Sequence, residues 1–176
     1  VVRILGKGGM GTVYLARDQQ LGRFVAIKVL NPSEVSGGDR KARFLREARS
    51  AVAVRHQNVA TIYEVDETEE GVPYIVMEYC EGETLSHRLR RLPLDVTEFL
   101  SIAKQIAAGV AAAHEKGILH RDIKSANIIV EPTGLTKILD FGLAKPIPRA
   151  LTDPGLERSF ESESGHFFGT LHFISP

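Results

Sequence analysis

Three polar side chains in the second half of the chain have the types and spacing needed for phosphate chemistry. Asp122 and Asn127 lie in an H-R-D-I-K-S-A-N sequence, and Asp140 begins a D-F-G sequence. A carboxylate held on a short loop can accept a proton from a hydroxyl, and Lys124 can neutralise charge on a transferring group. Asn127 and Asp140 carry the oxygens that hard cations prefer. The alternative for each residue is a polar side chain that caps a turn.

A glycine-rich turn near the start offers a second kind of chemistry. Gly6, Gly8 and Gly11 form G-x-G-x-x-G, whose backbone N–H groups can approach phosphate oxygens closely. A dinucleotide site uses similar glycines but needs a helix directly after the turn. The strand-like residues 12–16 follow here instead. Taken alone, the turn favours an ordinary hairpin.

Lys28 lies in an apolar stretch, where a lysine usually points outward to solvent. Glu47 lies on a predicted helix, next to the apolar face formed by Phe44 and Ala48. Lone charges near a core rarely persist without a partner. We therefore expect Lys28 and Glu47 to pair, which leaves the ammonium aimed at bound phosphates.

The elements that must position these residues change in character along the chain. The spacing of Phe44, Ala48, Ala51 and Val52 predicts one helix in the first half. In the second half, apolar residues at i, i+3, i+4 and i+7 predict a strong helix. Strands are predicted over 1–5, 12–17, 24–30, 59–65, 74–77, 128–130 and 136–139, and helices over 40–54, 83–91 and 97–115. Residues 145–165 predict a mobile loop rich in Pro, Ser, Gly and Glu.

Composition narrows the classes of protein to which the chain can belong. Its 176 residues, 43% hydrophobic and 25% charged, suit one domain or two small lobes. Zero net charge argues against a nucleic-acid partner. Cys80 as the single cysteine fits a reducing compartment, so we expect a cytoplasmic domain. No apolar run approaches the ~18–20 residues of a membrane helix, and both ends predict a fragment of a longer protein.

In their order, these motifs resemble those of a eukaryotic-type (Hanks-type) protein kinase catalytic domain. The resemblance covers about the first two-thirds of that domain. The sequences of the motifs are similar to those of the bacterial members. It implies an α+β, bilobal fold: an N-lobe over 1–77 with a five-stranded antiparallel sheet and one helix, a hinge at 78–80, and a partial, mainly helical C-lobe over 81–176 that includes an activation segment at 140–176. Lys124, two residues after Asp122, resembles the serine/threonine-specific branch.

The resemblance also assigns roles to residues. It implies transfer of the ATP γ-phosphate to serine or threonine hydroxyls of protein substrates. ATP and Mg²⁺ are the implied cofactors, with Mn²⁺ as an alternative metal. Asp122 is the implied base with Lys124 beside it, and Asn127 and Asp140 are the implied metal ligands. The implied nucleotide-binding residues are Leu5, Gly6, Gly8, Gly11, Val13, Ala26, Lys28, Glu47, Met77, Glu78, Cys80 and Ile129. A stacked spine is implied for Ala51, Ile62, His120 and Phe141.

Regulation by phosphorylation is a further expectation. Arg43, Arg121 and Lys145 can form a basic pocket for a phosphorylated side chain of the activation segment. The candidate phosphosites are Ser162 and Ser164, then Thr152 and Ser159, whereas Thr170 is expected to line the substrate site. Autophosphorylation makes a kinase–kinase dimer an expected partner. The alternative is that these serines only make the loop soluble.

Three competing hypotheses stay open at this point. A nucleotide-binding pseudokinase or scaffold needs a damaged catalytic set, whereas Lys28, Asp122, Asn127 and Asp140 are all present. A small-molecule phosphotransferase is disfavoured by Lys124. An inactive fragment is the third, because the resemblance implies further C-lobe helices after residue 176.

Overall fold

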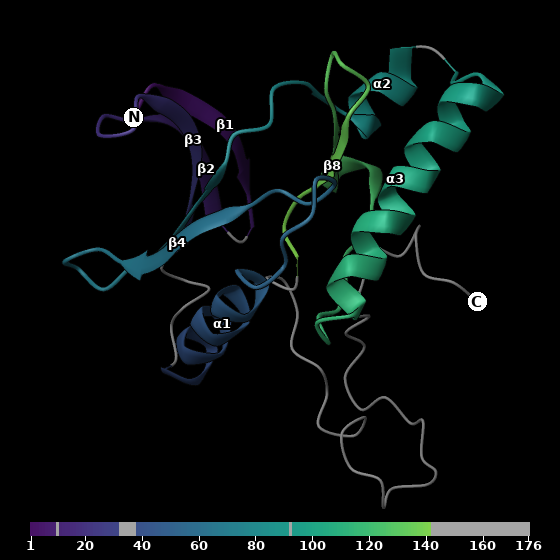
Figure 1. Cartoon of the computed structure of the whole chain (residues 1–176). Helices are drawn as coiled ribbons and strands as arrows, with labels where there is room; N and C mark the ends of the chain where they lie inside the picture. The colour runs from purple at the N-terminus through teal and green to yellow at the C-terminus, as the bar shows by residue number, and fades with distance from the viewer. Residues whose placement is uncertain (10, 32–37, 92, 142–176) are drawn as a thin grey trace, which may run out of the picture.

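The first half of the chain folds into a five-stranded antiparallel sheet with strand order β1-β2-β3-β5-β4. The computed structural model describes residues 1–9, 11–31, 38–91 and 93–141. Figure 1 shows this sheet beside one helix, α1 (Gly38–Ala51). The strands are β1 (Arg3–Gly8), β2 (Gly11–Asp18), β3 (Arg23–Leu30), β4 (Ile62–Glu67) and β5 (Pro73–Glu78). The predicted sheet with one helix is therefore confirmed.

Apolar residues of α1 and the sheet form the first core. Phe44, Leu45 and Ala48 lie on one face of the helix and are buried against Ile75 and Met77 of β5. Ala48 and Ile75 have no exposed surface. This packing explains why the helical spacing in the sequence predicted α1 correctly, since burial of one apolar face stabilises a surface helix.

Two strands in the first half, β1 and β4, differ from the prediction by more than one residue at an end. β1 begins at Arg3 and continues to Gly8, which pairs with Gly11, so the glycine run belongs to the hairpin itself. β4 begins at Ile62, because the residues before it pair elsewhere. Val59 forms a parallel bridge to Ile138, and the Ala60 amide donates to the Ile138 carbonyl at 2.9 Å.

In the second half, the described residues form a three-stranded sheet, β6-β7-β8, and two α-helices. The elements are β6 (Glu83–Thr84), α2 (Leu85–Arg91), α3 (Val96–His114), the 3-10 turn η2 (Ser125–Asn127), β7 (Ile128–Val130) and β8 (Thr136–Ile138). The predicted start of a helix at residue 83 was wrong, because Glu83 and Thr84 pair with Val130 and Ile129. The side chain of Thr84 accepts a hydrogen bond from the His87 amide and so starts α2.

The long helix α3 packs beside β8 (Figure 1). Asp95 caps its first turn by accepting a hydrogen bond from the Glu98 amide at 2.8 Å. Ala113 packs against Ile128 and Ile138 in the second core, while Val96, Phe99 and Leu100 remain exposed. By length and composition alone, α3 could cross a membrane, which weakens the expectation that the chain has no such segment. Core helices of soluble proteins also have these properties.

Asn58 joins three segments that are distant in the sequence. Its side chain is 1% exposed, and its Nδ2 donates to Gln105 Oε1 at 2.9 Å and to the Thr136 carbonyl at 2.8 Å. Replacing Asn58 with alanine should lower the free energy of unfolding by about 2–3 kcal/mol, because the buried partners lose their donor. Urea unfolding measures this change. Gln57→Ala, at the exposed neighbouring position, is the control, and equal effects of the two variants would contradict the role of Asn58.

Candidate active site

The predicted catalytic loop brings its three polar residues into contact. Lys124 Nζ lies 2.6 Å from Asp122 Oδ2. Asn127 Nδ2 donates to the Asp122 carbonyl at 2.9 Å and to Asp122 Oδ2 at 3.2 Å. The Asp122 side chain is only 11% exposed. A lysine and an amide therefore hold one carboxylate in a fixed position at the start of η2.

The His120 ring joins the backbone of this loop to the backbone just before Asp140. Its Nδ1 accepts a hydrogen bond from the Asp122 amide at 3.2 Å, so Nε2 carries the proton and donates to the Leu139 carbonyl at 2.7 Å. The ring lies edge-on to Phe141, with centroids 4.6 Å apart. Burial lowers the pKa of His120, so the imidazole is neutral and structural. Arg121, which follows it, has a positive φ of 64°.

The predicted spine residues meet in one cluster. Ala51 and Phe141 are buried in the second core, and Ile62 packs against it. Phe141 contacts His120 directly. The residues implied by the resemblance therefore form a continuous apolar connection from the first half of the chain to the D-F-G sequence.

Lys28 has a different partner from the one expected. Its Nζ lies 2.9 Å from Asp140 Oδ2, and its side chain is only 9% exposed. Glu47 instead pairs with Arg121, at 3.4 Å between Oε1 and Nη1. Among the described ion pairs there is none between Lys28 and Glu47, so the expected pairing was wrong for this conformation. Asp140 and Glu47 each have a cationic partner, as charged side chains near a core require. The partner of Glu47 is Arg121 instead of the expected Lys28.

A cavity of about 440 Å³ opens beside Asp140 and holds much of the implied nucleotide site. Val13 of β2, Ala26 of β3 and Met77 of β5 line it from the first sheet, and Ile129 of β7 lines it from the second. The other predicted residues that line it are Leu5, Gly6, Glu78, Cys80, Asn127 and Asp140. Burial raises the pKa of Cys80 to about 12, which keeps this thiol protonated.

Several lining residues were missed by the sequence reasoning. They are Arg3, Tyr79, Gly82, Thr84, Ala126 and Leu139. Tyr79 lies inside the predicted hinge, so the hinge range itself was the signal that could have included it. Leu139 precedes Asp140 and its amide donates to the Asn127 carbonyl at 2.8 Å, a contact between two loops that periodicity does not reveal.

The remaining predicted residues are not among those that line the cavity. They are Gly8, Gly11, Lys28, Glu47, Asp122 and Lys124. Gly11 has a packing reason to be glycine, because a Cβ there would lie 2.2 Å from the Val29 carbonyl oxygen. Apart from the adjacent residues in the chain, no atom of the described part of the structure lies within 4 Å of a Cβ added at Gly6 or Gly8, so these residues leave the space beside them open to a ligand.

The expected phosphate pocket can be described only in part. Arg121 is bound to Glu47, and the side chain of Arg43 lies outside the described residues. Lys145 and the candidate phosphosites Thr152, Ser159, Ser162 and Ser164 also lie outside the described residues, as does Thr170.

The implied magnesium ion fits the oxygens that the two loops present. Since Asn127 uses its Nδ2 toward Asp122, its Oδ1 has no hydrogen-bond donor among the described residues, and Asp140 uses only Oδ2 toward Lys28. Both residues line the cavity. The described residues contain no group of three His, Cys, Asp or Glu suited to a metal. Such a pair of ligands suits Mg²⁺, which keeps waters and binds substrate phosphates.

The comparisons with known proteins name the family that has this fold. Residues 1–176 match the protein kinase domain, and the chain belongs to this family. It is 39% identical over 177 residues to the serine/threonine-protein kinase PrkC of Bacillus subtilis (strain 168), covering 100% of this chain and 26% of PrkC. It is 36% identical over 177 residues to the serine/threonine-protein kinase PknB of Mycobacterium tuberculosis (strain ATCC 25177 / H37Ra), covering 98% and 27%.

A solved structure agrees with this assignment. The crystal structure of the Mycobacterium tuberculosis PknI kinase domain superimposes with a TM-score of 0.73 and 31% sequence identity, covering 82% of this chain and 58% of that one. The fold class predicted from the sequence is thereby confirmed. The chain spans about a quarter of the length of the curated relatives described above.

Proposed function

We propose that this chain transfers the γ-phosphate of ATP to serine or threonine hydroxyls of proteins. The carrying observation is the contact among Asp122, Lys124 and Asn127 at the edge of a cavity that Asp140 also lines. The names of the similar proteins, which are serine/threonine-protein kinases, support the same activity. This combination joins a positioned base, a cation and metal ligands at one place, which is what phosphoryl transfer requires.

The proposed roles follow from the chemistry of each side chain. Asp122 accepts the proton of the attacking hydroxyl. Lys124, 2.6 Å from Asp122, stabilises negative charge on the transferring phosphoryl group. Asn127 Oδ1 and Asp140 hold Mg²⁺, or Mn²⁺ in its place; when bound, the metal supplies charge neutralisation at the phosphates. Lys28 and the glycines Gly6, Gly8 and Gly11 position the phosphates.

The exchanged ion pairs support a proposal on what nucleotide binding changes in this site. Lys28 lies 2.9 Å from one oxygen of Asp140, so a metal ion on the other oxygen would place a second cation at the same carboxylate, and the two cations repel each other. We propose that magnesium and ATP draw Asp140 away, and that Lys28 then turns to Glu47 as Glu47 leaves Arg121. Arg121 then loses its contact with Glu47.

The wider setting of the activity is also a proposal. Protein substrates and autophosphorylation in a kinase–kinase dimer are proposed because the chain belongs to the protein kinase family. A cytoplasmic location of this domain is proposed because its single cysteine, Cys80, is a free and buried thiol. The lobe boundaries at 1–77, 78–80 and 81–176 are proposed on the same basis.

The deciding experiment is transfer of radiolabelled γ-phosphate from Mg-ATP to a basic protein substrate, followed by phosphoamino-acid analysis. Label on phosphoserine and phosphothreonine supports the proposal. Label on phosphotyrosine alone would contradict the proposed specificity. A nucleotide-induced rise in melting temperature without any transfer would favour a nucleotide-binding scaffold instead.

Asn31 supports the glycine-rich turn and gives a further prediction. Its Nδ2 donates to the carbonyls of Gly9 at 2.7 Å and Gly8 at 3.3 Å. Asn31→Ala should raise the KM for ATP about fivefold, because one net hydrogen bond contributes about 1 kcal/mol to the turn conformation. Steady-state kinetics at varied ATP measure this, with exposed Gln20→Ala as the control. A fall in kcat with an unchanged KM would contradict the positioning role.

A further inference from the structure

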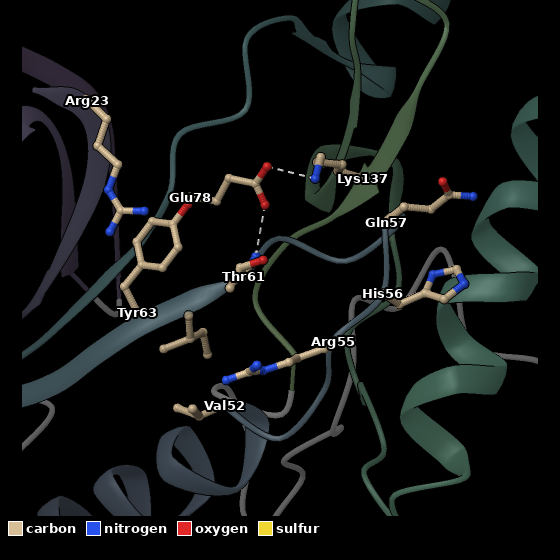
Figure 2. Close-up of a pocket in the computed structure, with 10 residues that line it drawn as sticks. Arg23, Val52, Arg55, His56, Gln57, Thr61, Tyr63, Glu78 and Lys137 are labelled. Carbon is tan, nitrogen blue, oxygen red and sulfur yellow. Dashed lines mark hydrogen bonds and ion pairs between the residues drawn. The ribbon is translucent and has the colours of Figure 1, made fainter. Parts of the chain in front are cut away.

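A second cavity, of about 750 Å³, lies apart from the proposed nucleotide site. Of the residues that line it, Glu78 is the one that also lines the nucleotide cavity. Figure 2 shows that its side chains come from β3, β4, the end of β5, β8 and the loop after α1. They are Arg23, Val52, Arg55, His56, Gln57, Thr61, Ile62, Tyr63, Glu78 and Lys137.

The charges of this cavity do not balance. Arg23, Arg55 and Lys137 face a single carboxylate, Glu78. That carboxylate is already satisfied, because Lys137 Nζ lies 2.7 Å from its Oε1 and the Thr61 amide donates to its Oε2 at 3.1 Å. Figure 2 shows both contacts as dashed lines. Arg23 has an ion-pair partner outside the lining, Asp18, at 3.5 Å, so the surplus positive charge of the cavity lies on Arg55.

Arg23 is held in a position that exposes hydrogen-bond donors. Its Cζ lies 3.8 Å from the centroid of the Tyr63 ring, so the ring covers the face of the guanidinium. Asp18 approaches Arg23 Nε only to 3.5 Å. Because guanidinium N–H groups lie in the plane of the group, those on the two Nη atoms remain available to a ligand.

Arg55 supplies the second donor. It is exposed, and no ion pair or hydrogen bond joins its side chain to another described residue. In Figure 2 its guanidinium extends toward the space below Tyr63. Two guanidinium groups and one half-exposed tyrosine ring therefore border the same cavity, and Val52 and Ile62 add apolar surface to it.

We propose that this cavity is a docking site for an acidic peptide segment of a protein partner. Guanidinium groups bind carboxylates with two parallel hydrogen bonds, so Arg23 and Arg55 can each take one Asp or Glu side chain. A single exposed ion pair contributes little, whereas two carboxylates on one chain bind together. Apolar atoms of the same peptide pack against Tyr63.

The test uses the 176-residue chain and a short fluorescein-labelled peptide of glutamates around one tyrosine. Fluorescence anisotropy measures its Kd, with a glutamine version of the peptide as the uncharged probe. The double variant Arg23→Gln/Arg55→Gln should weaken binding about tenfold or more. The matched control is Arg17→Gln/Arg49→Gln, which removes the same charge from exposed positions outside the cavity and should change Kd less than about twofold.

Three outcomes would overturn the proposal. If both double variants weakened peptide binding equally, the peptide would be attracted by the overall positive charge of the chain and not bound by this cavity. Displacement of the peptide by a non-hydrolysable ATP analogue would place it in the nucleotide cavity. Displacement by inorganic phosphate at an equal concentration would mean a simple anion site. The single variant Arg55→Gln changes an exposed side chain, so it repeats the measurement without disturbing the Arg23–Tyr63 contact.

Discussion

Replacing Asp122 with asparagine should lower kcat by about 10²–10⁴-fold, the usual contribution of a positioned general base. Asparagine has nearly the same size and keeps an acceptor oxygen for Lys124 and Asn127, which contact the aspartate at 2.6 Å and 3.2 Å. It cannot accept a proton from the substrate hydroxyl. The measurement is the initial rate of phosphate transfer at saturating Mg-ATP and protein substrate.

A control separates this loss of chemistry from a loss of structure. Asp122→Asn should retain the nucleotide-induced rise in melting temperature, since Asp122 does not line the nucleotide cavity. A variant that binds nucleotide but does not transfer phosphate would assign the base role to Asp122. A rate within about tenfold of the wild type would show that the proton leaves by another route.

The parts of the fold that could be predicted are those set by local pattern. Phe44, Ala48 and Ala51 repeat at helical spacing, and the same side chains that make this pattern are the ones that α1 buries. The stretch 24–30 was predicted as a strand, and β3 extends it by one residue, to Arg23. The predictions failed where pairing partners are distant. Glu83 and Thr84 pair with a strand more than forty residues later, which no local window contains.

The candidate site could also be predicted only in part. Its residue types follow from short motifs, so Asp122, Asn127 and Asp140 could be singled out from the sequence. The choice of ion-pair partner could not, because it depends on how α1 and the loop that carries Asp140 lie in the folded chain. The second cavity was not foreseen at all, since five separate segments assemble it.

Lys28→Met should lower kcat/KM by at least about 10²-fold, the size expected when one fixed charge is removed from a phosphate site. Methionine fills a similar volume but cannot neutralise phosphate oxygens. It also leaves Asp140 without the cation that lies 2.9 Å away. Steady-state kinetics measure the effect. A parallel Lys41→Met variant removes another partly buried lysine, one that pairs with Glu67 away from the residues that line the nucleotide cavity, and should retain activity within about tenfold.

Stability measurements on the same Lys28 variant can determine which carboxylate it contacts in each state. In the free protein, a double-mutant cycle of Lys28→Met with Asp140→Asn should give a coupling energy of about 1 kcal/mol, because the two side chains are in contact. The cycle with Glu47→Gln should give a coupling near zero, because Glu47 pairs with Arg121. If Mg-ATP exchanges these partners as proposed, the two couplings reverse when ATP analogue and Mg²⁺ are present. Strong coupling to Glu47 in the free protein would contradict the ion pairs of this conformation.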